Sequence, residues 1–411
     1  MAADERLFSP LNLGNLALAH RIALAPLTRF RANDQHVPLD MVAEYYAQRA
    51  STPGTLLIAE ATFISPCAIG IANAPGIWSP QQISAWKKVT HAVHAKGCFI
   101  YLQLWALGRR ADPDLLARAE GGPYSVVSAS AVPENPGPNQ VIPQELTREE
   151  IKHFIDDYAE AAQNAMLAGF DGVEMHGANG YLIDQFLQEA CNNRTDEYGG
   201  SVENRARFGL EVTQAVIQAV GDSRKVAMRL SPWSSTDPTA TTGTGTSMQN
   251  AAVPVVAQFT HVIAELKKLD LAYLHLVESR VSGGDAGSAI YGNFTGRNDP
   301  FVEIWGVNGN KTPLILAGGF TPESARKVVS EHYARENVCI AFGRHYISTP
   351  DLPFRLCKGL ALNPYDRSTF YKVMSAEGYT DYPFSEEYVA ANERRCVDSG
   401  HPLAIYLAQG Y

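Results

Sequence analysis

Eight short apolar stretches, separated by segments of helical periodicity, most constrain what this chain can fold into. Their apolar residues run on without alternating with polar ones, which is typical of strands buried on both faces of a parallel sheet. The predicted strands are residues 22–28, 55–62, 98–104, 172–175, 225–230, 272–277, 313–317 and 338–342. Strands that alternate with helices in this way predict a parallel sheet covered by helices.

The segments between the strands carry signals for helix starts. Ser79 and Thr147 each stand three residues before a Gln or Glu, the pattern of a capping box. Thr321 precedes Pro322, so we expect Thr321 to cap a helix whose first residue is Pro322. Further helices are expected at residues 41–49, 202–220 and 256–269.

The number of strands favours an α/β fold closed into a (β/α)8 TIM barrel over an open, doubly wound sheet. An open sheet normally carries Gly-x-Gly-x-x-Gly after its first strand, and no such run follows Thr28. Residues 7–16 predict an N-terminal hairpin, and residues 352–411 predict a C-terminal extension. We expect residues 1–411 to form a single barrel domain.

Composition excludes several classes of protein. The chain has 411 residues, of which 45% are hydrophobic, and a formal charge of −9, which argues against nucleic acid or an anionic membrane as its main partner. No apolar run approaches the roughly 20 residues of a membrane span. The six cysteines form no close pairs, so their spacing suggests neither a zinc site nor disulfides, and an acidic N-terminus favours a cytoplasmic protein.

Polar and glycine residues gather where the predicted strands end. In a TIM barrel the active site lies at the carboxyl ends of the strands. The residues found there are Pro26, Thr28, Ala61, Gln103, Trp105, His176, Asn179, Tyr181, Arg229, Gly318, Gly319, Gly343 and Arg344. We therefore expect one site at one end of the barrel.

His176, Asn179 and Tyr181 form the most informative group. A histidine and an amide at the mouth of one strand can both donate hydrogen bonds to a single ligand oxygen, and a phenol close behind them can deliver a proton. A lone histidine is more often structural, and Tyr181 could be a packing aromatic at the start of a helix. The three together favour catalysis.

The glycines after the seventh and eighth strands suggest a phosphate site. Gly318, Gly319 and Gly343 match the position where barrels often hold phosphate with backbone N–H groups, and Arg344 adds a charged donor. Taken alone, the glycines could simply turn tight corners, and Arg229 could belong to a structural ion pair. Together with Gln103 and Arg229, they favour a phosphorylated cofactor.

With these residues, the sequence resembles the old yellow enzyme family of FMN-dependent ene-reductases, which also contains the plant oxophytodienoate reductases. The resemblance runs from residue 6 to about residue 384 and rests on residues 25–29 (APLTR), 103–105 (QLW), 176–181 (HGANGY), 193–201 (NRTDEYGGS), 228–232 (MRLSP) and 369–371 (TFY). The fourth and fifth motifs in combination are highly specific.

The resemblance implies a role for each of these residues. Non-covalent FMN would be bound by Pro26, Leu27, Thr28, Ala61, Gln103, Arg229, Gly318, Gly319, Gly343, Arg344, Phe370 and Tyr371. His176 and Asn179 would hold the carbonyl oxygen of an α,β-unsaturated substrate, and Trp105 would shape the pocket. Hydride transfer to the β-carbon would be followed by protonation of the α-carbon by Tyr181. Ala61 departs from the glycine of the best-known yeast members, and the Thr/Gly-rich residues 236–247 look expanded.

The electron donor should share the substrate pocket. A separate nicotinamide domain would need its own glycine fingerprint, and residues 283–287 lack that pattern. We expect NADPH, with NADH as the alternative, in ping-pong reduction of a small enone or enal by a monomer or homodimer. Two other hypotheses are an isomerase or dehydrogenase of secondary metabolism on the same fold, and a phosphosugar lyase or aldolase barrel without flavin.

Overall fold

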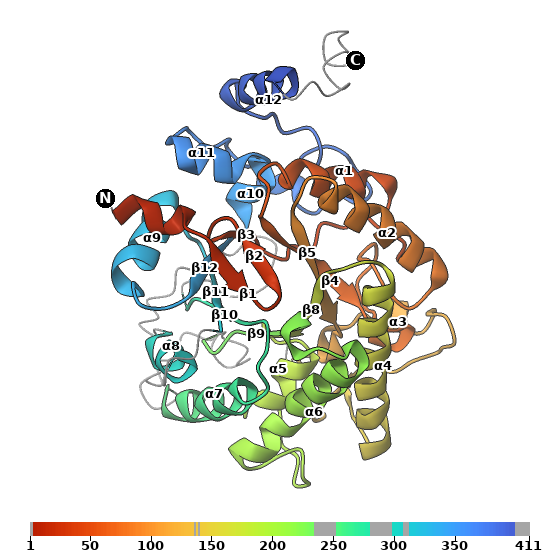
Figure 1. The fold of residues 1–411 in the computed structure, drawn as a ribbon. Coiled ribbons are helices and arrows are strands. Elements are labelled where there is room, and N and C mark those ends of the chain that lie inside the picture. Colours follow the sequence, from red (N-terminus) through yellow and green to blue (C-terminus); the bar gives the residue numbers. More distant parts are fainter. Residues whose placement is uncertain are drawn as a thin grey trace.

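A closed barrel of eight parallel strands forms the centre of the structure (Figure 1). The computed structural model describes residues 3–134, 137–138, 140–233, 252–279, 298–306 and 312–398. Around the barrel the strands follow the order β10-β11-β12-β3-β4-β5-β8-β9. They are β3 (Ile22–Leu24), β4 (Leu56–Phe63), β5 (Phe99–Trp105), β8 (Gly172–Gly177), β9 (Val226–Leu230), β10 (Tyr273–Val277), β11 (Leu314–Ala317) and β12 (Val338–Phe342). The predicted barrel is confirmed.

Helices surround the barrel (Figure 1). They are α1 (Asp40–Arg49), α2 (Pro80–His94), α3 (Pro113–Leu116), α4 (Arg148–Leu167), α5 (Leu182–Leu187), α6 (Val202–Val220), α7 (Ala252–Lys267), α8 (Asp299–Gly306), α9 (Pro322–Lys327), α10 (Arg344–Ser348), α11 (Leu352–Lys358) and α12 (Glu386–Asp398). The expected capping boxes form at Ser79 and Thr147, and a third forms at Thr321 with Ser324 as its partner.

Some predicted boundaries differ from the observed ones for local reasons. The first strand, expected to reach residue 28, ends at Leu24, because Pro26 has no N–H with which to continue the ladder. The fourth strand continues two residues beyond its expected end, to Gly177. The long segment after β5 contains α3 and two short strands, β6 (Val127–Ser128) and β7 (Gln144–Glu145). The Thr/Gly-rich residues 236–247 lie outside the described residues.

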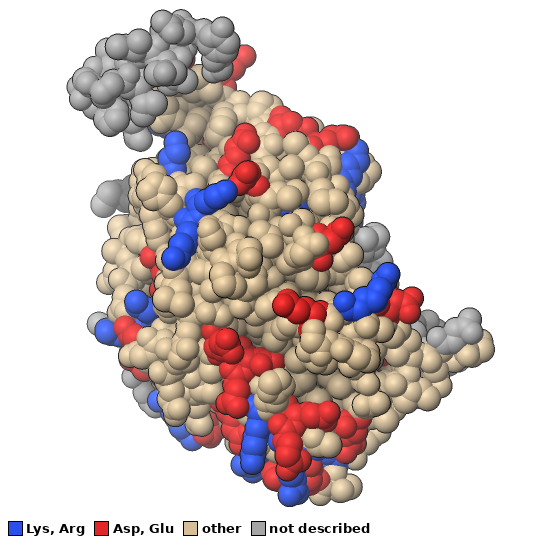
Figure 2. Space-filling view, turned by 90° about the vertical axis from the view of Figure 1, so that its right-hand side faces the viewer, with Lys and Arg blue, Asp and Glu red and all other residues tan. Residues whose placement is uncertain are grey.

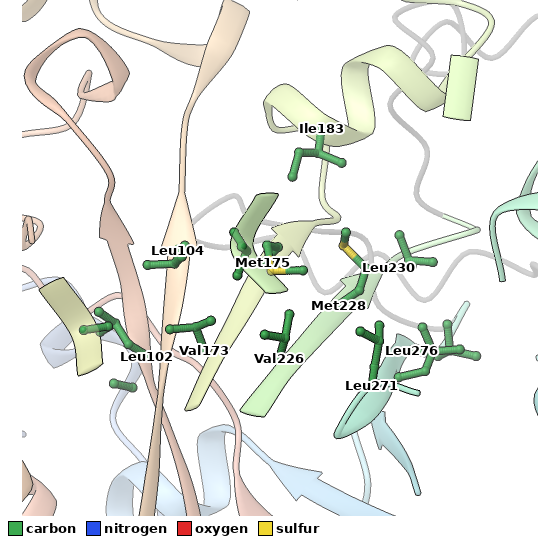
Figure 3. Packing of buried hydrophobic residues seen from close by; sticks show 14 of the residues in the cluster. Leu102, Leu104, Val173, Met175, Ile183, Val226, Met228, Leu230, Leu271 and Leu276 are labelled. Carbon is green, nitrogen blue, oxygen red and sulfur yellow. The ribbon is translucent and has the colours of Figure 1, made fainter. Parts of the chain in front are cut away.

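The outer face of the barrel carries the main hydrophobic core. Alternate strand residues such as Leu102, Val173 and Met228 are fully or almost fully buried and belong to one cluster with apolar residues of the surrounding helices. Figure 3 shows these side chains on adjacent strands, with Ile183 of α5 lying above them. At roughly 25 cal/mol per Å² of buried apolar area, this cluster dominates the stability of the fold.

The inside of the barrel is apolar at the end where the strands begin. The N-terminal hairpin of β1 (Leu11–Leu13) and β2 (Leu16–Leu18) places Leu11, Leu13 and Leu18 in one cluster with Tyr101 and Tyr273 of the barrel. In Figure 1 the hairpin lies in front of this end of the barrel. The expected hairpin is therefore present, and it closes the barrel at the end opposite the predicted site.

Three buried arginines, two in the loop after β3 and one at the end of α1, hold the C-terminal extension in place. Arg29 donates to the carbonyl oxygens of Phe370 (2.9 Å) and Gly378 (2.7 Å). Arg31 donates to carbonyl oxygens of residues 369, 370, 375 and 377 at 2.8–3.2 Å, and Arg49 to that of Tyr379 at 3.1 Å. The extension is thus fixed through its backbone carbonyls.

In the described ranges, no helix has the length and apolar character needed to cross a membrane. On the face that includes α4, shown in Figure 2, the basic side chains are separated from one another by acidic and uncharged ones. That face therefore presents no continuous basic surface for a polyanion.

The anchoring of the extension can be tested at Gly378. Its φ is +62°, and an added Cβ would lie 2.0 Å from Oγ1 of buried Thr369, whereas Gly359 has a similar φ of +67° with open space around it. Both changes to alanine should cost about 1–2 kcal/mol for the left-handed backbone. We expect Gly378→Ala to cost about 1–3 kcal/mol more, because the overlap displaces Thr369. Urea unfolding measures the difference, and equal losses in the two variants would contradict the packing described.

Candidate active site

The barrel register brings the predicted polar residues of four adjacent strands together. His176 on β8 lies opposite Arg229 on β9, and Arg229 lies opposite His275 on β10. Gln103 on β5 lies opposite Glu174 on β8. The predicted residues Gln103, His176 and Arg229 therefore share the carboxyl-terminal half of one barrel.

His176 is buried and neutral, and its geometry selects one tautomer. Burial lowers the pKa of His176 well below its usual value, and the positive charges of Arg229 and Arg110 lower it further. The backbone N–H of Ala178 donates to Nδ1 at 3.3 Å. Because Nδ1 accepts this bond, the single ring proton lies on Nε2. His176 can therefore offer an uncharged N–H donor to a ligand.

Hydrogen bonds to the backbone of Asn179 fix its position, while its side-chain oxygen has no hydrogen-bond partner among the described residues. Its φ is +58°, a left-handed conformation that asparagine tolerates better than most residues. Its N–H donates to Oγ of Ser231 at 2.7 Å, and its carbonyl accepts from Arg110 at 2.8 Å. The side-chain Oδ1 is buried without a hydrogen-bond partner among the described residues. A buried oxygen in this state can accept a hydrogen bond, and the amide that carries it is free to turn its Nδ2–H toward a ligand instead.

Tyr181 stands at the N-cap of α5, where three side chains surround its ring. Trp105 and His176 meet it edge-on, with ring centroids 4.8 Å and 4.9 Å away, and the guanidinium of Arg110 lies 5.1 Å from its centroid. Trp105 in turn stacks on Phe63 at 4.9 Å. The structure thus brings together His176, Tyr181 and Trp105, which the sequence analysis assigned to one site.

A buried carboxylate that the sequence analysis did not single out connects these strands. Glu174, fully buried, accepts from Nε2 of Gln103 at 2.7 Å and bonds Nδ1 of His275 at 2.8 Å. Burial by itself favours the protonated acid, but the contact with His275, the charge of Arg229 and the bond from Gln103 outweigh it and lower the pKa of Glu174. A glutamate and a histidine inside apolar strand runs were the signal available in the sequence.

Arg229 supplies the positive charge of this network. Its residue is only 9% exposed, and its Nε has no hydrogen-bond partner within the described part of the chain. Burial lowers the pKa of Arg229, and the negative charge of Glu174 opposes that shift. Burial also lowers the pKa of His275, so His275 stays neutral. An arginine is not deprotonated in a protein, so a cation with an unused N–H lies at this end of the barrel.

The predicted phosphate residues follow the neighbouring strands β11 and β12, and β12 pairs with β3. Gly318 and Gly319 follow β11 with φ of +136° and +61°, which only glycine adopts readily. A Cβ on Gly343 would lie 3.4 Å from Cδ2 of Leu27, so the ends of β12 and β3 are close together. Arg344 places its guanidinium 5.6 Å from the centroid of Tyr365. These conformations fit glycines that bind phosphate through their N–H groups, and they equally fit glycines that only form tight turns.

The remaining predicted residues surround the same region. Thr28 is half-buried just after β3, beside buried Pro26, and Ala61 lies in an apolar cluster with Trp105. Phe370 is nearly buried, whereas Tyr371 is 40% exposed and lies 5.4 Å from the ring of Phe30. The C-terminal extension therefore brings its two aromatic residues close to the loop after β3, 340 positions earlier in the chain.

Comparison with known proteins identifies the family. Residues 6–363 match the family described as NADH:flavin oxidoreductase / NADH oxidase. The chain belongs to this family. A chanoclavine-I aldehyde reductase of Penicillium roqueforti is 52% identical over 388 residues, which cover 94% of this chain and 99% of the relative. A probable inactive reductase, easA, of Epichloe festucae var. lolii is 51% identical, with coverage of 96% and 99%.

The solved structures agree. Old yellow enzyme from Pichia sp. superposes with a TM-score of 0.80 at 37% identity, covering 94% of this chain and 95% of that one. The protein is thus a flavin oxidoreductase of the old yellow enzyme family, as its sequence motifs implied.

The residues at the barrel mouth fit the FMN that this family implies. Nε of Arg229, which has no hydrogen-bond partner among the described residues, offers a donor to a polar ring edge. Inside the barrel, Ala25 just after β3, Ala317 at the end of β11 and Ala341 near the end of β12 are small residues that take up little space. A planar ring system needs both features, a donor at one edge and small residues on one side. The chemistry and the sizes of these side chains therefore suit a flavin.

The Glu174 network generates a prediction about stability. Glu174→Leu leaves the buried donors of Gln103 and His275 without an acceptor and Arg229 without its counter-charge, so we expect a loss of about 3–5 kcal/mol in unfolding free energy. Glu174→Gln should lose less, because an amide can still accept from Gln103 while His275 changes tautomer.

The same variants carry a pH dependence whose sign follows from the lowered pKa of Glu174. A carboxyl group with a folded-state pKa below its ordinary 4.5 stabilises the fold above that pH and loses this contribution as the pH falls. The stability gap between wild type and Glu174→Gln, measured by urea unfolding, should therefore shrink below about pH 4.5. A gap that widens on acidification would contradict an ionised Glu174.

Proposed function

We propose that this flavin oxidoreductase reduces the activated C=C bond of α,β-unsaturated aldehydes and ketones with NADPH. The observation that carries the proposal is the group at the end of β8: a buried, neutral His176, the side chain of Asn179 beside it in the loop, and the ring of Tyr181 packed against His176. The name of the Penicillium roqueforti relative, an aldehyde reductase, favours an enal as substrate.

The cofactor residues divide by chemistry. Bound FMN would supply hydride-carrier chemistry between nicotinamide and substrate. Gln103 and Arg229 would bind the polar edge of its ring, and Thr28 a ring carbonyl. Backbone N–H groups at Gly318, Gly319 and Gly343, together with Arg344, would bind its phosphate. Pro26, Leu27, Ala61, Phe370 and Tyr371 would contact the remaining surface.

His176 and Asn179 would bind the carbonyl oxygen of the substrate. Nε2–H of His176 and the side-chain amide of Asn179 can both donate to that oxygen, which draws electron density away from the conjugated double bond. As hydride reaches the β-carbon, negative charge develops on the same oxygen, so both hydrogen bonds strengthen in the transition state. A neutral imidazole performs this role without giving up its proton. These two residues therefore act as an oxyanion clamp.

Tyr181 would complete the reaction by protonating the α-carbon. Its hydroxyl belongs to a ring fixed between Trp105 and His176. The guanidinium of Arg110, 5.1 Å from the ring centroid, favours the negative charge that remains on the oxygen after the proton leaves. Tyr181 then recovers a proton from solvent. Retention of a tyrosine here favours net reduction over isomerisation.

The function is tested by following the flavin. The purified protein should be yellow, NADPH should bleach it under anaerobic conditions, and cyclohexenone or an enal should restore the colour. Because NADPH and substrate would use one pocket, initial rates should give the parallel double-reciprocal lines of ping-pong kinetics. A bleached flavin that no enone reoxidises would refute the proposal, and substrate turnover without net NADPH consumption would indicate an isomerase instead.

Tyr181→Phe separates the two halves of the reaction. We expect reoxidation by an enone to slow by about 10²–10⁴-fold, the usual contribution of a general acid, while reduction by NADPH changes little. Stopped-flow absorbance of the flavin measures both steps. Tyr388→Phe is the control, because it removes a tyrosine hydroxyl that bonds the carbonyl of Ser51, away from the end of β8. Equal damage to both steps in Tyr181→Phe would contradict proton donation by Tyr181.

A further inference from the structure

Outside the active site, a thiol, an imidazole and a carboxylate converge on the surface. Cys67 lies in the short 3-10 helix Pro66–Ala68 after β4, and His153 and Asp157 lie one turn apart on one face of α4. Sγ of Cys67 is 3.4 Å from Oδ2 of Asp157, and Nε2 of His153 is 3.7 Å from Oδ1 of Asp157. All three ligand atoms lie within 4.8 Å of one another.

The separation of 3.4 Å between Sγ and Oδ2 matches what one zinc ion would impose, and the 3.7 Å between Nε2 and Oδ1, the other oxygen of the same carboxylate, is close to it. Bonds of about 2.3 Å to sulfur and about 2.0–2.1 Å to nitrogen and oxygen, at tetrahedral angles, separate sulfur from oxygen by about 3.5 Å and nitrogen from oxygen by about 3.3 Å. The contact between Cys67 and Asp157 also fits a weak S–H hydrogen bond. The 3.7 Å between His153 and Asp157 is too long for a hydrogen bond, so these two side chains face each other across one turn of α4 without a direct bond.

We propose that Cys67, His153 and Asp157 bind a Zn²⁺ ion, with solvent in the fourth coordination position. A thiolate and an imidazole are ligands that Zn²⁺ prefers and that Ca²⁺ and Mg²⁺ do not. A thiolate, a carboxylate and a neutral imidazole balance the charge of the ion, and the proton of the thiol is released to solvent on binding.

The site is accessible, and it is connected to the wall of the active site. The side chain of His153 is 67% exposed and that of Asp157 only 11%, so an ion can enter from solvent and meet a fixed carboxylate. The segment that carries Cys67 bonds the chain around Trp105: Ile64 N–H donates to the carbonyl of Trp105 at 3.2 Å, and Leu107 N–H to that of Ala68 at 3.3 Å. A bound ion would fasten this segment to α4.

The first test is binding of Zn²⁺ alone to chelator-treated holoprotein, measured by competition with a chromophoric chelator. We expect one equivalent to bind and to raise the midpoint of thermal unfolding. Cys67→Ser and Asp157→Asn should each weaken binding at least about a hundredfold, the upper limit for loss of an outer-shell partner. His94→Ala is the matched control, because His94 bonds Asp171 at 2.9 Å in a surface pair without a cysteine.

The second test needs no variant. Zn²⁺ should slow alkylation of Cys67 in the wild-type holoprotein, measured by peptide mass spectrometry, and should leave the exposed thiol of Cys357 unprotected. Protection confined to Cys67 would support the site even if Cys67→Ser failed to fold. Absence of protection at saturating Zn²⁺, or equal affinity of wild type and Cys67→Ser, would overturn the proposal.

Discussion

The ionised carboxylate of Glu174 is the constraint around which the carboxyl-terminal half of the barrel is arranged. It lies in a fully buried position on β8, where it accepts from Gln103 on one side and bonds His275 on the other, near the positive charge of Arg229. An unpaired charge in that place would cost several kcal/mol, so the strands β5, β8, β9 and β10 must all contribute a polar side chain to it. Among the described residues, Nε of Arg229 has no hydrogen-bond partner, and burial together with the charge of Arg229 keeps His176 uncharged. The electrostatics of the ligand-binding groups therefore depend on the buried pair of Glu174 and Arg229 together.

Much of this arrangement was predictable because the sequence carries it in local patterns. Continuous apolar runs and capping boxes at Ser79 and Thr147 identify strands and helices, and eight alternations imply a closed barrel whose strand ends meet. That geometry alone predicted that His176 and Arg229 lie close together. The family resemblance then supplied the flavin, which no spacing of residues could have named.

The sequence could not show contacts between residues far apart in the chain, nor which of two opposing local signals decides where a strand ends. Glu174 and His275 are 101 positions apart, and a polar residue inside a buried strand has no partner until the barrel register is known. Cys67 has no other cysteine close by in sequence, so its pattern suggested no metal, yet the fold places it beside two residues of α4. The first strand ended early because a missing N–H at Pro26 overrode an apolar run. In each case the deciding partner came from another element.

The attachment of the C-terminal extension has a consequence for how the protein is made. Arg29, Arg31 and Arg49 are synthesised early, but their acceptors are backbone carbonyls of residues 369–379, roughly 330–350 positions later. While the chain leaves the ribosome at about 5–20 residues per second, these guanidinium groups wait for tens of seconds without their native partners. The aromatic residues Phe370 and Tyr371 arrive with that last segment. The mouth of the barrel is consequently completed only after all eight barrel strands have been synthesised, and a nascent chain can hold a nearly finished barrel before it can hold a finished pocket.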